Sequence, residues 1–161
     1  NWISDSQGFT IDNDINYRSL RFPEGFTEYL HLKYHSLMIN ILGQLNPGKV
    51  DLYDYTTFGI ATCGKDYTYK IHDDTASKLL TCIIYISPKE NFGTDLYKFE
   101  NGKIVNRYPI PWAQNKAIFF SRKLYSTPHS YKSNGVDTRQ TLLYNLCTKS
   151  SKALVQKIEN I

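Results

Sequence analysis

The chain contains two histidines, an aspartate and an arginine whose order suits a metal site beside an anion-binding cation. His72 is followed two positions later by Asp74, then by His129 and, ten residues further on, by Arg139. Two imidazoles and one carboxylate on one face of the metal form the ligand set of non-haem iron(II) oxygenases, and they leave adjacent positions open. These residues therefore predict an iron(II) site at which O₂ and a chelating 2-oxo acid can bind together.

The preference for Asp74 over its neighbour Asp73 follows from strand geometry. The residues that lead up to His72 alternate in polarity as a strand does. Side chains two positions apart on an extended chain point the same way, so His72 and Asp74 can share one metal ion, whereas Asp73 points away from it.

Arg139 bears on which kind of metal enzyme the ligands would serve. A zinc hydrolase could use the same three ligands with one open position. A 2-oxo acid that chelates iron, however, has a distal carboxylate, which needs a cationic partner once water is removed. Arg139 begins an apolar run, residues 140–146, that is typical of a strand beside the one carrying His129. We therefore interpret Arg139 as the cation that binds the co-substrate.

Length, composition and charge favour a single globular domain, residues 1–161. The chain is 41% hydrophobic and 21% charged with a net charge of +4. Its lysines and arginines are scattered, which gives no strong signal for nucleic acid, and no apolar run approaches the roughly 18 residues of a membrane span. Cys63, Cys82 and Cys147 form no paired motif, which favours a reducing, cytoplasmic compartment. No pattern bears on oligomeric state.

One long helix is predicted ahead of the metal-binding region, over residues 24–42. Pro23 suits its first turn and Gly43 can end it. His31 and His35 lie one turn apart on this helix, but the residues between them lack the glutamate of an HExxH zinc motif, so we interpret them as surface or packing residues. The apolar residues predicted to share its buried face are Phe26, Leu30, Leu37 and Ile41.

Short runs rich in tyrosine, threonine and isoleucine follow, which predicts a series of strands. Asn101-Gly102 is expected to form a tight hairpin turn. The chain is thus divided into an N-terminal lead-in and helix (1–48), a jelly-roll core (49–147) and a serine-capped C-terminal helix (150–161), a mainly β fold with flanking helices. The predicted strands are 52–61, 66–72, 79–87, 95–100, 103–108, 116–121, 125–131 and 138–147.

The segment 67–146 resembles the 2-oxoglutarate/iron(II)-dependent dioxygenases, and most closely their prolyl-hydroxylase-like branch. Two departures from the family pattern are Thr94, where a second glycine is usual, and Asn115 in a turn that usually carries glycine. Asn tolerates the left-handed conformation, so the second departure is mild. The runs that carry the resemblance are Tyr69–Asp74, Thr81–Ile86, Gly93–Leu96 and Ala117–Phe120, followed by His129 and Arg139.

The resemblance implies a double-stranded β-helix, the cupin-like form of the jelly roll, and an O₂-dependent hydroxylase. It implies that the two histidines and Asp74 hold Fe(II), and that 2-oxoglutarate is the co-substrate. It further implies that Arg139 pairs with the distal carboxylate of 2-oxoglutarate with help from the hydroxyl of Tyr85, and that Tyr69 lines the same pocket. Ascorbate is a candidate accessory reductant.

The substrate expected from the resemblance is a peptide or protein side chain such as proline. The same chemistry on a free small molecule is an alternative; an open groove beside the metal would favour a polypeptide and a closed pocket a metabolite. A non-catalytic jelly-roll binding module is a different class of function, and the complete set of metal ligands together with Arg139 argues against it. Nucleic-acid base demethylation, known in the wider superfamily, finds little support in the dispersed positive charge.

Overall fold

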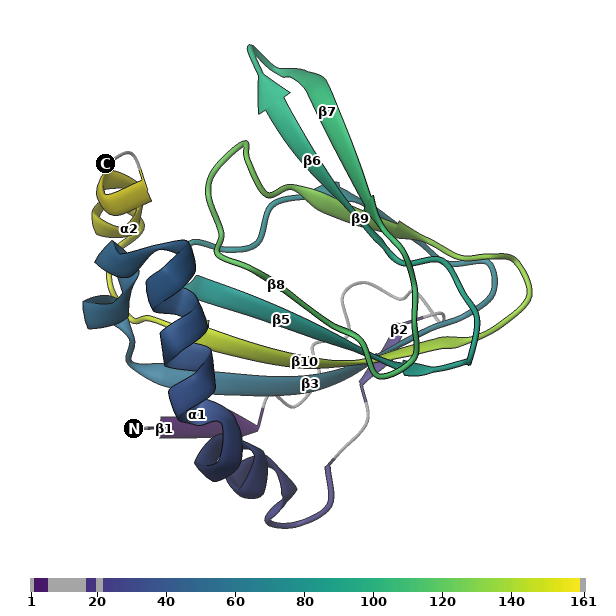
Figure 1. The fold of residues 1–161 in the computed structure, drawn as a ribbon, viewed down its shortest axis with the longest axis horizontal. Coiled ribbons are helices and arrows are strands. Elements are labelled where there is room, and N and C mark those ends of the chain that lie inside the picture. Colours follow the sequence, from purple (N-terminus) through teal and green to yellow (C-terminus); the bar gives the residue numbers. More distant parts are fainter. Residues whose placement is uncertain (1, 6–16, 20–21, 160–161) are drawn as a thin grey trace.

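Two β-sheets face each other in the computed structural model, and helices lie outside them (Figure 1). The structure describes residues 2–5, 17–19 and 22–159, with side chains over 22–159. In chain order the elements are β1 (Trp2–Asp5), β2 (Tyr17–Ser19), α1 (Phe26–Leu45), a 3₁₀ helix η1 (Pro47–Leu52), β3 (Tyr55–Cys63), β4 (Thr68–His72), β5 (Lys78–Ser87), β6 (Thr94–Glu100), β7 (Lys103–Ile110), β8 (Ala117–Phe120), β9 (His129–Lys132), β10 (Arg139–Cys147) and α2 (Lys152–Glu159).

Strands from distant parts of the chain alternate between the two sheets. The larger sheet has the order β1-β3-β10-β5-β8, with β2 also paired to β3, and the smaller has the order β4-β9-β6-β7. The chain passes from β3 in one sheet to β4 in the other and back to β5, and again from β8 to β9 to β10. Most pairings are antiparallel. This arrangement is a double-stranded β-helix, so the predicted fold class is confirmed.

All eight predicted strands are present, with shifted ends. The hairpin between β6 and β7 turns at Asn101 and Gly102, whose φ angles of 50° and 74° are the positive pair that a type I′ turn requires. The strand predicted over 125–131 begins only at His129, because Tyr125 has a left-handed φ of 62° and interrupts the extended chain. The strand predicted over 52–61 begins at Tyr55, after η1.

The long helix is confirmed, but its predicted end is wrong, and one of the four residues predicted to lie on its buried face, Leu37, is exposed. Gly43 lies inside α1, which continues to Leu45 and ends just before Pro47. Leu37 is 51% exposed, whereas Met38 and Leu42 are buried. Leu30 is buried as predicted, and Phe26 and Ile41 are partly buried against the main hydrophobic cluster. The contact with the sheet sets this face, and a helical repeat alone does not.

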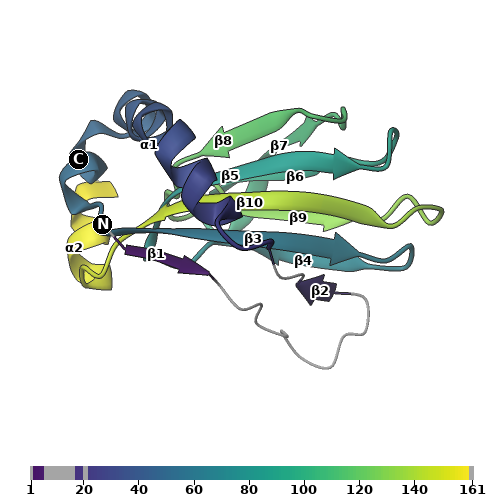
Figure 2. The same cartoon turned by 90° about the horizontal axis from the view of Figure 1, so that it is seen from below.

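The larger sheet buries side chains on both of its faces. α1 covers one face, and the smaller sheet faces the other (Figures 1 and 2). Along β10, Leu142 and Leu146 belong to the main hydrophobic cluster on the helix side, while Thr141 and Asn145 line a cavity between the sheets. Ala61, which lies opposite Thr141 in the register, lines the same cavity. Small and polar residues on the inner face thus leave space where larger ones would fill it.

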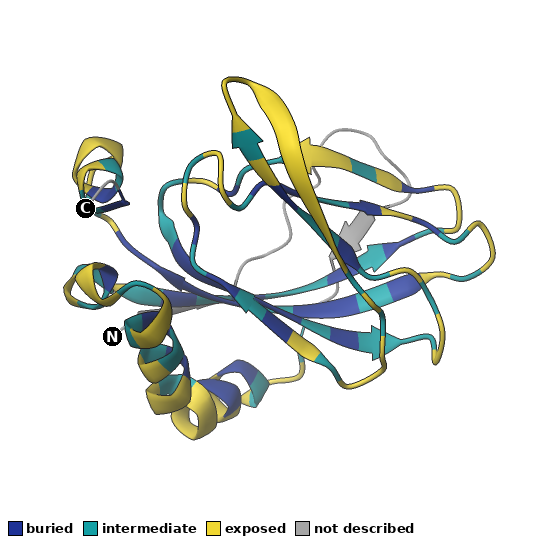
Figure 3. Cartoon of the chain, turned by 45° about the horizontal axis from the view of Figure 1, so that its top comes forward, coloured by how far each residue is buried: buried dark blue, intermediate teal, exposed yellow. Residues whose placement is uncertain are grey.

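Exposure differs sharply between the body and its edge. Strands β3, β5 and β10 of the larger sheet are buried or half-buried along their length, whereas the β6–β7 hairpin projects beyond the sheet and β7 is exposed along most of its length (Figure 3). The C-terminal helix α2 is capped as predicted by a serine, because Ser151 Oγ accepts a hydrogen bond of 3.3 Å from the backbone N–H of Leu154. The three cysteines are buried and form no disulfide among the described residues. None of the helices in the described part of the chain is long and apolar enough to cross a bilayer.

Candidate metal centre

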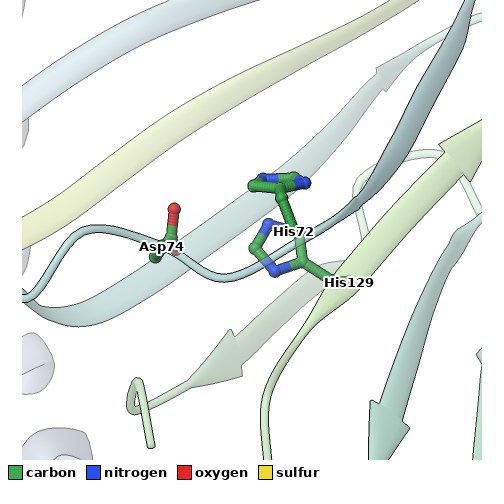
Figure 4. A group of neighbouring side chains, drawn as sticks. All are labelled: His72, Asp74 and His129. Carbon is green, nitrogen blue, oxygen red and sulfur yellow. The ribbon is translucent and has the colours of Figure 1, made fainter. Parts of the chain in front are cut away.

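His72, Asp74 and His129 come together between the two sheets (Figure 4). Each offers one ligand atom, and these atoms all lie within 4.8 Å of one another. His72 ends β4 and His129 begins β9, and the two residues are partners in the register of the smaller sheet. Their ring centroids are 4.2 Å apart. The three side chains are therefore close enough to hold one ion, and neighbouring Asp73 is not part of the group.

Backbone carbonyls orient both imidazoles. Nδ1 of His72 lies 2.9 Å from the carbonyl oxygen of Lys70, and Nδ1 of His129 lies 3.2 Å from that of Thr127. A carbonyl only accepts, so each Nδ1 carries the proton and donates it. This leaves Nε2 of both rings with a free lone pair for a metal, the usual way in which such hydrogen bonds prepare a histidine ligand.

Asp74 is buried, and both of its carboxylate oxygens accept hydrogen bonds. The hydroxyl of Thr81 donates to Oδ2 at 2.7 Å, and the ammonium of Lys78 donates to Oδ1 at 2.6 Å. Burial raises the pKa of Asp74, but the charge of Lys78, the charge that His129 gains at low pH and these two hydrogen bonds outweigh it, and the pKa lies below its ordinary value. The carboxyl is therefore ionised, as a metal ligand must be.

His129 is held in its neutral form. Burial lowers the pKa of His129 to about 4, and the nearby imidazole of His72 acts in the same direction, although the carboxylate of Asp74 opposes both. Near neutral pH the ring is unprotonated at Nε2. Together with the ionised Asp74, this protonation state suits a divalent cation.

A buried ionic cluster supports the loop that carries Asp74. Glu159 of α2 accepts hydrogen bonds from Lys49 at 2.9 Å and from Arg122 at 2.7 Å. Arg122 also donates from Nε to the backbone carbonyl of Asp74 at 2.9 Å. The C-terminal helix is thereby linked through two hydrogen-bonded steps to a proposed metal ligand.

Arg139, the first residue of β10, is a buried cation without a carboxylate partner among the described residues. Its Nη2 donates to Thr94 Oγ1 at 3.0 Å, and its guanidinium lies 3.9 Å from the ring centroid of Tyr131. The Nε–H is buried and has no hydrogen-bond partner. Burial lowers the pKa of Arg139, yet a guanidinium stays protonated near neutrality. A buried guanidinium of this kind favours the binding of an anion.

One cavity joins the arginine to the three candidate ligands. It has a volume of about 340 Å³ and runs between the sheets. Arg139 is the register partner of Cys63 at one end of β10, and Lys78 is the register partner of Cys147 at the other end. The two cations therefore lie at opposite ends of the cavity. The charged and metal-ligating residues that line the cavity are Arg139, His72, Asp74, His129 and Lys78.

The two tyrosines expected near the co-substrate lie in different places. Tyr69 lines the cavity, and its ring meets that of His72 edge-on with centroids 4.1 Å apart. Tyr85 is fully buried outside the lining of the cavity; its hydroxyl accepts the backbone N–H of Thr94 at 2.9 Å, and its ring stacks on Trp112. Tyr85 packs beside Arg139, whose guanidinium carbon lies 5.2 Å from the centroid of the tyrosine ring. Its hydroxyl as a co-substrate ligand stays a prediction.

Several residues of this region escaped the sequence reasoning. Tyr131, the aromatic residue nearest to Arg139, lies two positions after His129 on β9, so strand periodicity could have placed both on one side. Thr81 and Lys78, which bond the carboxylate of Asp74, carried no comparable signal, because the chain reverses between β4 and β5 before they reach it.

Comparison with known proteins identifies the fold. No protein-family model matches the sequence, and no curated protein matches it either. The structure is similar to the crystal structure of a Pseudomonas putida prolyl-4-hydroxylase, with a TM-score of 0.60 and 11% identity over 83% of this chain and 72% of that one. It is also similar to EvdO2 from Micromonospora carbonacea var. aurantiaca, with a TM-score of 0.53 and 12% identity over 83% of this chain and 68% of that one. The chain thus shares its fold, a double-stranded β-helix with flanking helices, with a prolyl-4-hydroxylase.

Proposed function

We propose that the protein is a 2-oxoglutarate- and O₂-dependent Fe(II) dioxygenase that hydroxylates its substrate. One observation carries the proposal: a buried arginine that has no counter-ion in the described part of the chain lies in the same cavity as two histidines and a carboxylate. The three ligands suit a divalent metal, and Arg139 suits an anion held between itself and that metal. A zinc hydrolase would leave this buried charge without a partner.

The donor set fits iron(II). Two imidazoles present Nε2, and Asp74 adds one carboxylate whose second oxygen accepts a hydrogen bond from Thr81. Three protein ligands leave the remaining positions of an octahedral ion for a chelating 2-oxo acid and for O₂. Residues His72, Asp74 and His129 would hold the iron.

The other end of the cavity fits the distal carboxylate of 2-oxoglutarate. The partnerless Nε–H of Arg139 and its remaining N–H groups can bind a carboxylate through two hydrogen bonds, which is the strongest geometry for this pair. Thr94 fixes one edge of the guanidinium, and Tyr131 supports its face. The arginine is therefore oriented before any ligand arrives.

When bound, the iron would supply O₂ activation, in which 2-oxoglutarate loses CO₂ to become succinate with one oxygen atom while the other oxygen atom converts a substrate C–H group to C–OH. The protein contributes position and electrostatics. Arg139 orients the co-substrate, Asp74 and the histidines fix the metal, and the surrounding sheets exclude water. We propose a peptide or protein side chain such as proline as substrate, since the fold is shared with a prolyl-4-hydroxylase.

An anaerobic titration tests this function. Fe(II) and 2-oxoglutarate added together should give the weak visible charge-transfer band of the chelate. Arg139→Ala should raise the dissociation constant of 2-oxoglutarate by about a hundredfold, because the lost contact is a buried charge pair, while metal affinity stays close to that of the parent. Asp74→Ala should abolish metal binding.

Arg107→Ala is the matched control, since Arg107 is exposed and pairs with Asp95 outside the cavity. It should behave as the parent protein does. A parent protein that gives no band and no succinate with any substrate, or an Arg139→Ala variant with unchanged affinity for 2-oxoglutarate, would contradict the proposal.

A further inference from the structure

Lys78 and a metal ion would compete for the same oxygen atom. The ammonium of Lys78 lies 2.6 Å from Oδ1 of Asp74. Thr81 already donates to Oδ2, which makes Oδ1 the oxygen that a metal would use most readily. A divalent cation that binds Oδ1 displaces Lys78, because like charges prevent the two from sharing the oxygen.

Lys78 lies on the opposite side of the metal ligands from Arg139. It begins β5 and is the register partner of Cys147, the last residue of β10, whereas Arg139 is the first. Asp74 contacts Lys78, and Tyr131, two residues along β9 from His129, contacts Arg139. If the co-substrate lies between the metal and Arg139, the substrate is left with the end of the cavity that Lys78 lines.

The charges that line the cavity leave Lys78 unpaired once metal and co-substrate are bound. Among the residues that the structure describes, the cavity is lined by two basic residues, Lys78 and Arg139, and by one acidic residue, Asp74. The two charges of iron(II) offset the two of 2-oxoglutarate, and Asp74 offsets Arg139. One positive charge then remains, on Lys78. An unpaired charge in a half-buried site is costly, so it favours a ligand that carries an anion.

The lining around Lys78 is polar. Thr57, Ser77 and Asn145 share this end of the cavity, and the buried side-chain oxygen of Asn145 has no hydrogen-bond partner among the residues that the structure describes. Its amide nitrogen donates to Thr57 at 3.2 Å, so the free oxygen can accept from a ligand. This end thus offers one cation and one acceptor, which suits a substrate with an acidic group and a nearby N–H or O–H.

We propose that Lys78 determines substrate specificity: the metal releases it from Asp74, and it then binds a carboxylate of the substrate. The inference rests on the proposed function and adds the substrate class to it. The carboxylate belongs either to a free acid or to an acidic side chain next to the hydroxylated position of a peptide. Both present the same group to the ammonium of Lys78.

A titration with Mn(II) tests the first step. Lys78→Met removes the competing ammonium and frees Oδ1 of Asp74, while Thr81 still donates to Oδ2, so Mn(II) should bind at least about tenfold more tightly than to the parent. Lys103→Met, in the exposed β6–β7 hairpin, removes the same charge far from the cavity and should leave the affinity unchanged. Equal or weaker Mn(II) binding by a folded Lys78→Met variant overturns the inference.

Binding of matched acids and amides tests the second step. The protein loaded with Mn(II) and 2-oxoglutarate is offered N-acetylproline and its carboxamide, and a short proline peptide with an adjacent Glu or Gln. In the parent, the acidic member of at least one pair should bind at least about tenfold more tightly than its neutral partner. Lys78→Arg should keep this preference and Lys78→Met should lose it. A preference for N-acetylproline over its carboxamide would indicate a free acid as substrate, and a preference for the Glu peptide over the Gln peptide would indicate a polypeptide.

The outcomes separate this inference from the proposed function. A parent protein that binds neither Mn(II) nor 2-oxoglutarate removes both proposals. A parent that binds them but shows no preference for either acid, or a Lys78→Met variant that keeps the preference, overturns only the role of Lys78.

Discussion

The two faces of β10 are both buried, but their side chains differ in size and polarity. On the helix side, Leu142 and Leu146 pack into the main hydrophobic cluster beneath α1. On the inner side, Thr141 and Asn145 face the smaller sheet and line the cavity. Adjacent residues of one strand therefore serve the core and the candidate site in alternation.

This contrast shows that burial alone does not separate a core from a site. Facing sheets pack about 10 Å apart when their side chains interdigitate. Here the inner face of β3 offers Gly59 and Ala61 opposite Leu143 and Thr141 of β10, and a cavity of about 340 Å³ remains. The small side chains of β3 keep this cavity open. The two faces should accordingly respond differently to substitution.

The largest expected effect falls on the helix side. Leu146 is fully buried in the main cluster, and Leu146→Ala should lower the free energy of unfolding by about 3 kcal/mol through lost burial and a new void. Chemical denaturation measures this loss. The folded variant should bind Mn(II) as the parent does, and a large drop in that affinity would show that the two faces are coupled.

The inner face should show the reverse response. Ala61→Leu places a larger side chain in the cavity near Arg139, so 2-oxoglutarate affinity should fall by about a hundredfold, which is about 2.7 kcal/mol. The free energy of unfolding should change far less, because the added atoms enter existing space. Calorimetry on the Mn(II)-loaded protein measures the affinity. Ala61→Ser, which leaves the cavity open, is the matched control, and equal binding by both variants would contradict this assignment of the face.

Local patterns predicted the strands and the grouping of the metal ligands well. Alternation places His72 and Asp74 on one side of an extended chain, and the structure brings both beside His129. The Asn101-Gly102 turn was equally readable, because only a few residue types accept two positive φ angles. Each of these features depends on the conformation of a few neighbouring residues. The roles of the ligands remain predictions.

Features that depend on contacts between distant segments were missed. The buried face of α1 is set by the sheet beneath it, so Met38 replaced Leu37 as a core residue. The late start of β9 depends on the left-handed turn at Tyr125. Lys78 meets Asp74 only because the chain between β4 and β5 folds back on itself. No pattern in the sequence predicts the ion pair between Lys78 and Asp74.

The smallest effect is expected where the inner face supports the metal ligands without binding the metal. Thr81, on β5, donates its hydroxyl proton to Oδ2 of Asp74 at 2.7 Å. Thr81→Val keeps the shape of the side chain and removes this donor, so one oxygen of the buried carboxylate loses its hydrogen bond. Partners of metal ligands are worth about tenfold or more in metal affinity. Mn(II) should bind roughly tenfold more weakly, a change of about 1.4 kcal/mol.

Thr81→Ser separates the hydroxyl from the methyl group of this side chain. The serine variant keeps the donor and should retain most of the Mn(II) affinity, while losing a little stability through the missing methyl group. If valine and serine weaken Mn(II) binding equally, Thr81 acts through packing, and the inner face contributes to the core as the helix side does. If only valine weakens it, the two faces of the larger sheet are divided between stability and binding down to a single hydroxyl.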